Sequence, residues 1–282
     1  MGGGPSPVDL LILGAGWTST FLIPLLDDSD STSQKISYAA TTRDGRNGTI
    51  PFTFDPDSDD TEPYKRLPSA KIILITFPVT GSTQPKTLVE RYECTHPESK
   101  GGKGAKYILL GATSIWKEQT LVTEASPYDH SNERAQGEDA LMQLCGERSL
   151  VLSLAGLYGG ERDPRTWGVR VVKSKSDVKK KGAVHLVNGR DVARGVLGCG
   201  WSGLAGKRWI VTDLRCYDWW DLLMSFDDGA AQGMEFARWV GELMVEEGVS
   251  LLPREPGKLG RVLDGRAFWN RLGIWPSVRR VC

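Results

Sequence analysis

Two closely spaced glycines follow a short apolar run near the start of the chain, in the stretch DLLILGAGWTSTF (residues 9–21). Gly14 permits a tight turn at the end of a strand, and Gly16 leaves room for the backbone to approach a pyrophosphate. The amides at the start of the following helix would then point at the phosphates. Ser19 replaces the third glycine of the G-x-G-x-x-G pattern and is still small enough for close helix–strand packing. The stretch therefore predicts a dinucleotide cradle formed by Gly14, Gly16, Trp17, Thr18 and Ser19.

The end of the second expected strand, YAATTRDGR (residues 38–46), bears on the choice of nucleotide. A cofactor without a 2′-phosphate commonly meets an acidic side chain at this strand end. Here the strand ends in Thr41 and Thr42, and Arg43 follows; a hydroxyl and a guanidinium suit a phosphate dianion. Asp44 comes one residue too late for the acidic position. We therefore expect NADP as the cofactor, with NAD as the alternative.

Alternating elements over the first two thirds of the chain must position these residues. Apolar runs of strand length occur at residues 10–13, 36–41, 71–77, 107–111 and 150–154, and helix-like segments at 17–26, 84–93 and 135–144 lie between them. The apolar runs are rich in Ile, Leu and Val, as expected when helices cover both faces of a parallel sheet. The pattern predicts an α/β fold with a doubly wound, Rossmann-like parallel sheet.

This rhythm changes after about residue 158. Residues 184–187 and 208–212 are expected to form isolated short strands among helices at 191–199, 217–225 and 233–247. We interpret residues 1–8 as a flexible tail and 9–158 as the dinucleotide-binding core. Residues 159–282 are expected to form a small, irregular C-terminal substrate lobe interleaved with the last elements of the core. A polar insertion at residues 95–106 is expected on the surface, with His96 in solvent.

Composition limits the classes of partner. The chain has 282 residues, 25% of them charged, and a formal net charge of zero, so nothing favours nucleic acid or an anionic membrane. Its five cysteines are scattered without metal-like spacing, which predicts no metal site and suits a reducing compartment. No apolar run is long enough to span a bilayer, and the N-terminus lacks a signal-peptide pattern. We expect a cytoplasmic protein.

Five motifs occur in a recognisable order: the glycine turn, TFPV (76–79), LLGATSIW (109–116), SLAGLYGGERDP (153–164) and VHLVNGRDVARGVL (184–197). Together they resemble the extended and atypical short-chain dehydrogenase/reductase superfamily, in particular its NAD-dependent epimerase/dehydratase-like branch. The resemblance implies an NAD(P)-binding fold and a cofactor whose adenosine lies along Phe77 and Pro78, with Asp55 near the adenine edge. It also implies hydride transfer to or from a small carbonyl or hydroxyl metabolite.

The resemblance further implies a catalytic triad, and each of its members is changed here. Such enzymes place a Ser or Thr at a strand end and, on the next helix, a Tyr four residues before a Lys. Together these groups move a proton beside the hydride path. Counting back from Ile115 gives Ala112 at the hydroxyl position. Thr113 and Ser114 are the neighbouring hydroxyl groups that would take its place if the loop shifts.

On the helix, counting back from Glu138 puts Arg134 at the lysine position and His130 at the tyrosine position. A histidine exchanges protons near neutral pH, and beside Arg134 a neutral His130 acting as a base fits best. In an alternative register Tyr128 is the catalytic tyrosine, but the residue four positions later is then Asn132. His130 and Arg134 also fit a purely structural interpretation, as polar residues in the first turns of a helix.

Substrate contacts are expected around the loop after the sixth strand, at Tyr158, Arg162 and Trp167, where an arginine would hold a carboxylate or phosphate. We expect a small-molecule substrate, and the sequence leaves a homodimer open. The leading hypothesis is an NADP-dependent oxidoreductase or epimerase-type enzyme. Two alternatives stay open: a redox-neutral isomerase, dehydratase or cyclase on the same fold, and a non-catalytic NADP-binding sensor or partner protein.

Overall fold

A computed structural model describes residues 5–28, 35–99, 104–117, 121–199, 204–226 and 231–278 of the chain. Residues 1–4 of the predicted tail and residues 100–103 of the predicted insertion lie outside these ranges. Val8, which was expected in the tail, is the first residue of strand β1.

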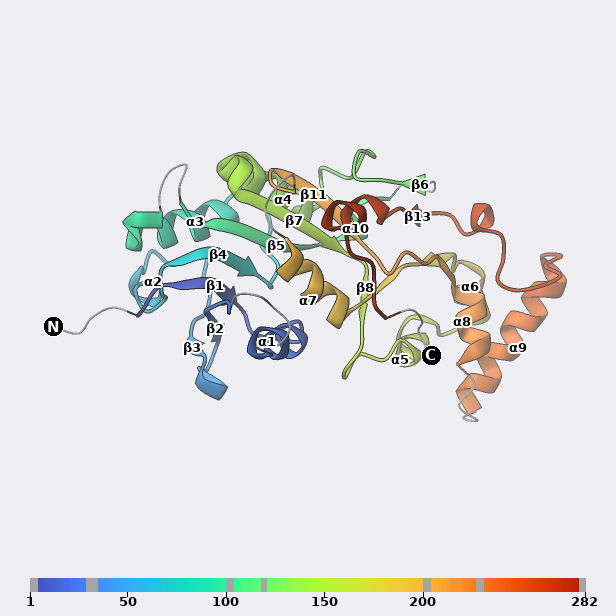
Figure 1. The fold of residues 1–282 in the computed structure, drawn as a ribbon. Coiled ribbons are helices and arrows are strands. Elements are labelled where there is room, and N and C mark those ends of the chain that lie inside the picture. Colours follow the sequence, from blue (N-terminus) through green and yellow to red (C-terminus); the bar gives the residue numbers. More distant parts are fainter. Residues whose placement is uncertain are drawn as a thin grey trace.

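A seven-stranded parallel sheet forms the centre of the molecule (Figure 1). Its strand order is β11-β7-β5-β4-β1-β2-β3. The strands are β1 (Val8–Leu13), β2 (Tyr38–Thr42), β3 (Ile50–Pro51), β4 (Ala70–Ile75), β5 (Lys106–Ala112), β7 (Ser149–Leu154) and β11 (Lys207–Val211). Because all strands run the same way, the turns that follow them meet at one edge of the sheet. The α/β, doubly wound fold predicted from the apolar runs is confirmed.

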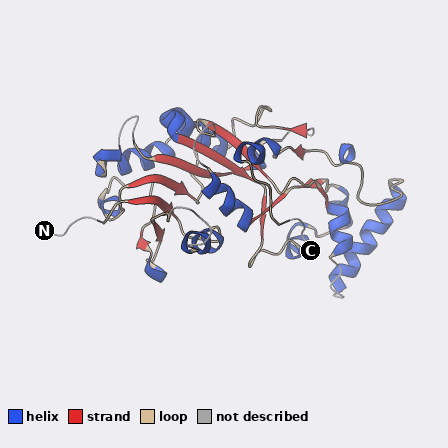
Figure 2. Cartoon of the chain, viewed as in Figure 1, coloured by secondary structure: helices blue, strands red, loops and turns tan. Residues whose placement is uncertain are grey.

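Helices cover both faces of this sheet (Figure 2). One layer contains α1 (Ser19–Asp27), α7 (Gly189–Gly198) and α10 (Arg266–Leu272), and the other contains α2 (Glu62–Lys65), α3 (Gln84–Thr95) and α4 (Glu133–Cys145). Successive side chains of a strand point to opposite faces. Along β1, Leu10 and Ile12 therefore pack with the first layer, and Leu11 and Leu13 with the second. Burial on both faces explains why the strands are continuously apolar in sequence.

The second half of the chain also builds a smaller lobe. Short strands pair there as β8 (Gly156–Tyr158) with β10 (Leu186–Asn188) and β9 (Ala183–Val184) with β12 (Tyr217–Asp218). A further pair, β6 (Leu121–Val122) with β13 (Val262–Leu263), packs beside Ile210 of β11. The lobe helices are α5 (Arg165–Val171), α6 (Lys175–Lys179), α8 (Trp219–Ser225) and α9 (Ala231–Glu246). Buried residues of the lobe, including Val178, Trp220 and Phe236, form a separate apolar cluster. In Figure 1 this lobe lies at the end of the molecule opposite the N-terminus.

Two expectations about these elements are wrong. Residues 208–212 were expected as an isolated strand, but β11 pairs in register with β7, Trp209 beside Leu152, and forms one edge of the main sheet. His96 was expected in solvent, but it is buried against α3 and its ring nitrogen Nε2 lies 2.8 Å from the Leu67 carbonyl. The sequence around His96 is polar and gave no sign that this side chain would be buried.

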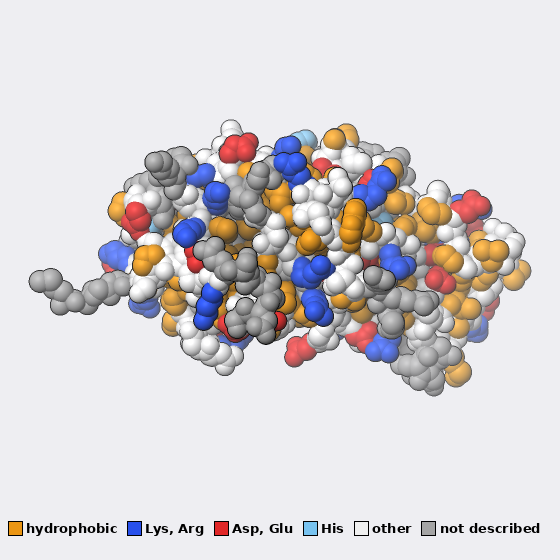
Figure 3. Space-filling model, in the orientation of Figure 1, with side chains coloured by type: hydrophobic (Ala, Val, Ile, Leu, Met, Phe, Trp, Pro, Cys, Tyr) orange, Lys and Arg blue, Asp and Glu red, His pale blue; other side chains and the backbone are white. Residues whose placement is uncertain are grey.

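Charged groups of both signs are interspersed with apolar side chains on the face drawn in Figure 3, in keeping with the net charge of zero. Among the described residues, no helix combines the length and apolarity needed to cross a membrane.

Candidate functional site

A cleft of about 1070 Å³ opens at the edge of the sheet where β1, β2, β4, β5 and β7 end. It collects most of the predicted cofactor residues. Those on its wall are Gly14, Gly16, Trp17, Thr18, Arg43, Phe77 and Pro78, and the predicted catalytic Arg134 and substrate-binding Arg162 join them. This is the edge at which ligands bind in open α/β sheets.

The turn between β1 and α1 requires glycine at position 14. Its φ is +90°, and a Cβ there would come within 2.8 Å of Thr76 Oγ1. The Gly14 amide donates to Thr41 Oγ1 at 2.9 Å, and the Thr76 hydroxyl donates to the Gly14 carbonyl. At Gly16, by contrast, a Cβ would approach only the Gly14 carbonyl, at 4.0 Å. The turn thus presents bare backbone on the cleft wall, as a diphosphate cradle must.

Ser19 does not reach the cleft. It is the first residue of α1, it is buried, and it is absent from the cleft wall. The structure therefore gives no support to Ser19 as a cofactor contact. Its small size serves the packing of α1 on the sheet.

The end of the cleft beside β2 is basic and aromatic. Arg43 and Arg46 line it, and the rings of Phe54 and Phe77 stack with centroids 5.8 Å apart. Arg46 and Phe54 were missed from the sequence, because both lie in irregular loops whose path could not be predicted. Asp55 does not line the cleft; its backbone carbonyl accepts a hydrogen bond from Arg91 Nη1 at 2.9 Å, so its predicted place at the adenine edge is not supported.

The other end of the cleft contains Ala112, at the tip of β5, and Arg134, on the first turn of α4. Apolar residues Leu154, Ala155 and Leu157 complete this end. Ala112 does stand at the strand end, where the resemblance implies a hydroxyl group. The ionisable residues on the described wall of the cleft are all arginines: Arg43, Arg46, Arg134 and Arg162.

His130 lies outside the cleft. Its side chain is 74% exposed, and its Nδ1 is 3.7 Å from Asp139 Oδ2. The count from Glu138 assumed a helix through position 130, but α4 begins at Glu133. Asn132 is its N-cap, and the Asn132 side chain accepts hydrogen bonds from the backbone amides of residues 134 and 135. His130 therefore leaves the helical register that brings Arg134 to the cleft. The structure gives no support to a catalytic His130.

Tyr128, the alternative catalytic residue, is also held away from the cleft. Its hydroxyl donates to Asp139 Oδ1 at 2.8 Å, and the Arg208 guanidinium stacks 4.4 Å from its ring centroid. Arg208 is buried and forms ion pairs with Glu138 Oε2 at 2.7 Å and with Asp139 at 2.9 Å. Burial raises the pKa of Glu138 despite this arginine. The cluster fixes α4 against β11, so we assign Tyr128 a structural role.

Thr113 and Ser114 form a 3₁₀ turn, Thr113–Ile115, directly after β5. Thr113 is buried, and neither residue lines the cleft. Ser114 instead borders a second cavity, of about 530 Å³, between this turn and the small lobe. The hydroxyl groups proposed to replace the one missing at Ala112 thus lie beyond the cleft wall.

Trp17 and Arg162 join the glycine turn to the loop after β8. The Arg162 guanidinium stacks 4.4 Å from the Trp17 ring centroid, and Trp17 Nε1 donates to the Gly159 carbonyl at 3.1 Å. Tyr158 and Trp167, the other predicted substrate residues, do not line the cleft. Tyr158 is buried, and burial raises the pKa of its hydroxyl. Of the three substrate residues predicted here, only Arg162 reaches the cleft.

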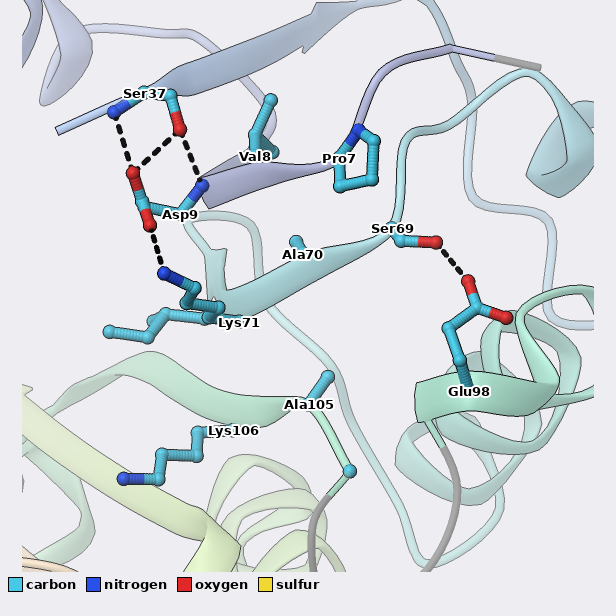
Figure 4. Close-up of a pocket in the computed structure, with 12 residues that line it drawn as sticks. Pro7, Val8, Asp9, Ser37, Ser69, Ala70, Lys71, Glu98, Ala105 and Lys106 are labelled. Carbon is cyan, nitrogen blue, oxygen red and sulfur yellow. Dashed lines mark hydrogen bonds and ion pairs between the residues drawn. The ribbon is translucent and has the colours of Figure 1, made fainter. Parts of the chain in front are cut away.

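A third pocket, of about 800 Å³, opens at the opposite edge of the sheet, where β1, β4 and β5 begin (Figure 4). Its polar groups bind one another. Asp9 accepts from Ser37 and pairs with Lys71 at 2.6 Å, and Ser69 donates to Glu98 (Figure 4). Hydrogen bonds from Lys71 and Ser37 lower the pKa of Asp9 to about 2. We interpret this pocket as a structural feature of the strand starts. In the described ranges, no cluster of His, Cys, Asp and Glu is suited to a metal ion.

The sheet order and the glycine turn define a Rossmann-like α/β fold. No protein-family model matches the sequence, and no curated protein matches it. Solved structures do resemble it over nearly its whole length. A conserved protein of unknown function from Silicibacter pomeroyi has a TM-score of 0.60 at 15% identity, covering 96% of this chain and 95% of that one.

Two neighbours of known activity have the same architecture. UDP-N-acetylglucosamine 4-epimerase from Bacillus cereus gives a TM-score of 0.58 at 10% identity, covering 97% of this chain and 95% of its own. Yeast methylglyoxal/isovaleraldehyde reductase complexed with NADPH gives 0.55 at 13% identity, covering 94% and 92%. These structures share the Rossmann-like α/β fold of this chain, which is the fold that the sequence resemblance implied.

Proposed function

We propose that the chain binds NADP(H) in the arginine-lined cleft and acts as an oxidoreductase or epimerase-type enzyme on a small carbonyl or hydroxyl metabolite. The observation that carries the proposal is the combination of a bare glycine turn with four arginines and no acidic side chain on the described cleft wall. Such a wall suits a ligand with several phosphates. The neighbours' NADPH complex and epimerase activity add support from the shared fold.

The preference for NADP over NAD rests on the end of the cleft beside β2. Thr42, Arg43 and Arg46 line this end. Asp44, the one acidic residue beside them, does not line the cleft and is paired with Arg46 Nη1 at 3.5 Å. An acidic group that would accept a ribose hydroxyl is thus missing from the wall, and two guanidinium groups that suit a 2′-phosphate are present.

At the other end, the nicotinamide of a bound cofactor would supply the hydride. The chain contributes Arg134 at the position where related enzymes are expected to have lysine, and Arg162 across the cleft. Two guanidinium groups in a partly apolar cleft stabilise negative charge that develops on a substrate oxygen. No acid–base side chain lines the described wall, so the proton would come from water or from the substrate.

The same observation favours a second candidate, a non-catalytic NADP-binding protein. Such a protein needs the glycine turn and the arginines but no proton donor. Turnover separates the two candidates, because binding alone would satisfy the second.

The test is calorimetric titration of the protein with NADPH, NADP, NADH and NAD, repeated with Arg43→Ala. We expect NADPH to bind and Arg43→Ala to weaken it roughly 10- to 100-fold, with little change for NADH. Arg66→Ala, at an exposed arginine that does not line the cleft, is the matched control and should bind like wild type. If none of the four nucleotides binds, the proposal fails. Where NADPH binds, loss of its absorbance with small carbonyl compounds supports the enzyme over the non-catalytic candidate.

A further inference from the structure

The buried and half-buried arginines of the described chain fall into two groups. Most of them form ion pairs with carboxylates: Arg91 with Asp59, Arg148 with Glu93, Arg194 with Asp191, Arg208 with Glu138, and Arg254 with Asp218. The two for which no such ion pair is present among the described residues are Arg134 and Arg261, and each lines a cavity. Arg134 faces the proposed cofactor cleft. Arg261 has no role in that proposal.

Arg261 is fixed in place by the turn after β5. Its Nη1 donates to the Thr113 carbonyl at 2.9 Å and to the Trp116 carbonyl at 2.5 Å. Its Nε and Nη2 make no hydrogen bond within the part of the chain that the structure describes. A guanidinium stays charged in proteins, and removing it from water without a counter-ion is costly. Burial accordingly lowers the pKa of Arg261.

The cavity beside Arg261 has a volume of about 530 Å³. Its wall comes from the turn after β5, from β9 and from the segment before β13, and is formed by Ser114, Trp116, Lys117, Gly182, Ala183, Leu259 and Arg261. None of these side chains is acidic. Lys117 is paired with Asp129, which does not line the cavity. The cavity therefore combines an anchored positive charge with a hydroxyl group.

One further titratable group lies close by. His185 is buried, its Nε2 accepts the Leu263 amide at 3.1 Å, and burial together with Arg261 lowers its pKa to about 4. His185 is therefore neutral at physiological pH and neither adds to nor offsets the charge of Arg261.

We propose that this cavity binds a carboxylate or phosphate group, with Arg261 as its charge partner and Ser114 as a second hydrogen-bond donor. Arginine presents paired N–H groups that match the oxygens of either anion. Ala112 lines the cofactor cleft and Ser114 lines this cavity, so a single turn separates the two. The anion is accordingly an acidic group of the substrate; that assignment rests on the proposed function, whereas anion binding at Arg261 does not.

Thermal unfolding in increasing inorganic phosphate, with ionic strength held constant by sodium chloride, tests the site. A ligand that binds the folded state raises Tm as its concentration passes Kd, and we expect a rise of roughly 5 °C at a hundredfold excess. Arg261→Lys should keep part of this rise, and Arg261→Gln should lose the part that belongs to this cavity. Any rise of Tm that phosphate still causes in Arg261→Gln reports phosphate bound in the arginine-lined cleft.

A second variant covers the case in which Arg261→Gln does not fold. Ser114→Asp keeps Arg261 and supplies a carboxylate inside the cavity, so it should raise Tm without phosphate and reduce the response to phosphate. Equal phosphate responses in wild type, Arg261→Gln and Ser114→Asp overturn the site. NADPH titration of the same samples reports on the cofactor cleft separately: an Arg261-dependent phosphate response without NADPH binding supports the anion site and removes its assignment to the proposed enzyme's substrate.

Discussion

The indole of Trp17 donates a hydrogen bond to the carbonyl of Gly159, 142 residues further along the chain, with Nε1 and the oxygen 3.1 Å apart. Trp17 also packs edge-on against Phe21, with ring centroids 4.9 Å apart, and carries Arg162 above its ring. One side chain of the glycine turn thus holds the first loop of the small lobe against the cofactor cleft.

Replacement of Trp17 should loosen this connection. We expect Trp17→Ala to lower the free energy of unfolding by about 2 kcal/mol, through lost packing and a lost hydrogen bond. Trp17→Phe keeps an aromatic ring and should cost about half as much. Hydrogen exchange of residues 156–163 should speed up in the order wild type, Phe, Ala. Equal exchange in all three would show that Trp17 does not hold the loop.

Gly16→Asp should block the cleft without unfolding the protein. A Cβ at this position meets only the Gly14 carbonyl, at 4.0 Å, so the side chain fits, but its carboxylate stands where phosphates are expected. We expect NADPH affinity to fall by at least about tenfold through repulsion, with Tm near that of wild type. Gly14→Ala is the contrasting variant: its Cβ would lie 2.8 Å from Thr76 Oγ1 at a φ of +90°, so Tm should fall as well.

His130 and Arg134 should respond differently to mutation. His130→Ala removes an exposed side chain away from the cleft and should leave NADPH affinity and turnover unchanged. Arg134→Ala removes a cation from the cleft wall and should weaken NADPH binding roughly tenfold, while Arg134→Lys restores much of it. Titration and steady-state kinetics of the three variants check this, and a large kcat loss in His130→Ala would contradict the assignment.

Two buried groups should give opposing contributions to stability between pH 4 and 6.5. Burial raises the pKa of Asp213 to about 6, so the folded state holds its proton longer than the unfolded state and stability falls as pH rises through this range. Burial lowers the pKa of His185 from its ordinary value of 6.5 to about 4. The unfolded state therefore binds a proton first as the pH drops below 6.5, and stability falls between pH 6.5 and 4. The two contributions should nearly cancel.

Single substitutions should expose each contribution. Asp213→Asn removes the first, so denaturant unfolding should show stability decreasing by about 3 kcal/mol from pH 6.5 to 4. His185→Gln should show the reverse slope, with stability decreasing as pH rises. The Asn oxygen can still accept from the Arg215 amide, and its NH2 group, at the position of the second carboxylate oxygen, can donate to the Tyr217 hydroxyl. A flat profile in Asp213→Asn would contradict the lowered pKa of His185, and a profile unchanged from wild type would contradict the raised pKa of Asp213.

The parallel core was predictable because strands covered on both faces are continuously apolar, as in the ILI of β4. The glycine turn was predictable because only glycine suits the backbone at position 14. Arg134 was placed through Glu138, since both lie in α4. His130 was misplaced because the helix starts after Asn132, a residue that favours N-caps and was the available signal.

Other features depend on tertiary contacts that carry no local signal. Arg208 meets Glu138 across 70 positions of sequence, and Arg261 meets the Thr113 carbonyl across 148. Neither pairing follows from composition or periodicity around these residues. The same holds for Arg46, whose place on the cleft wall depends on the path of the loop between β2 and β3.

The outermost strands of the sheet are short or flanked by residues that disfavour pairing with another strand. β3 has only two residues, and its last, Pro51, has no N–H to offer another strand. At the opposite edge, β11 begins with an exposed Lys207 and is packed by α10. A short, proline-ended strand and a lysine-flanked one are poor templates for added strands. The long apolar strands of the core are thus flanked on both sides by edges that disfavour the addition of a strand from another chain.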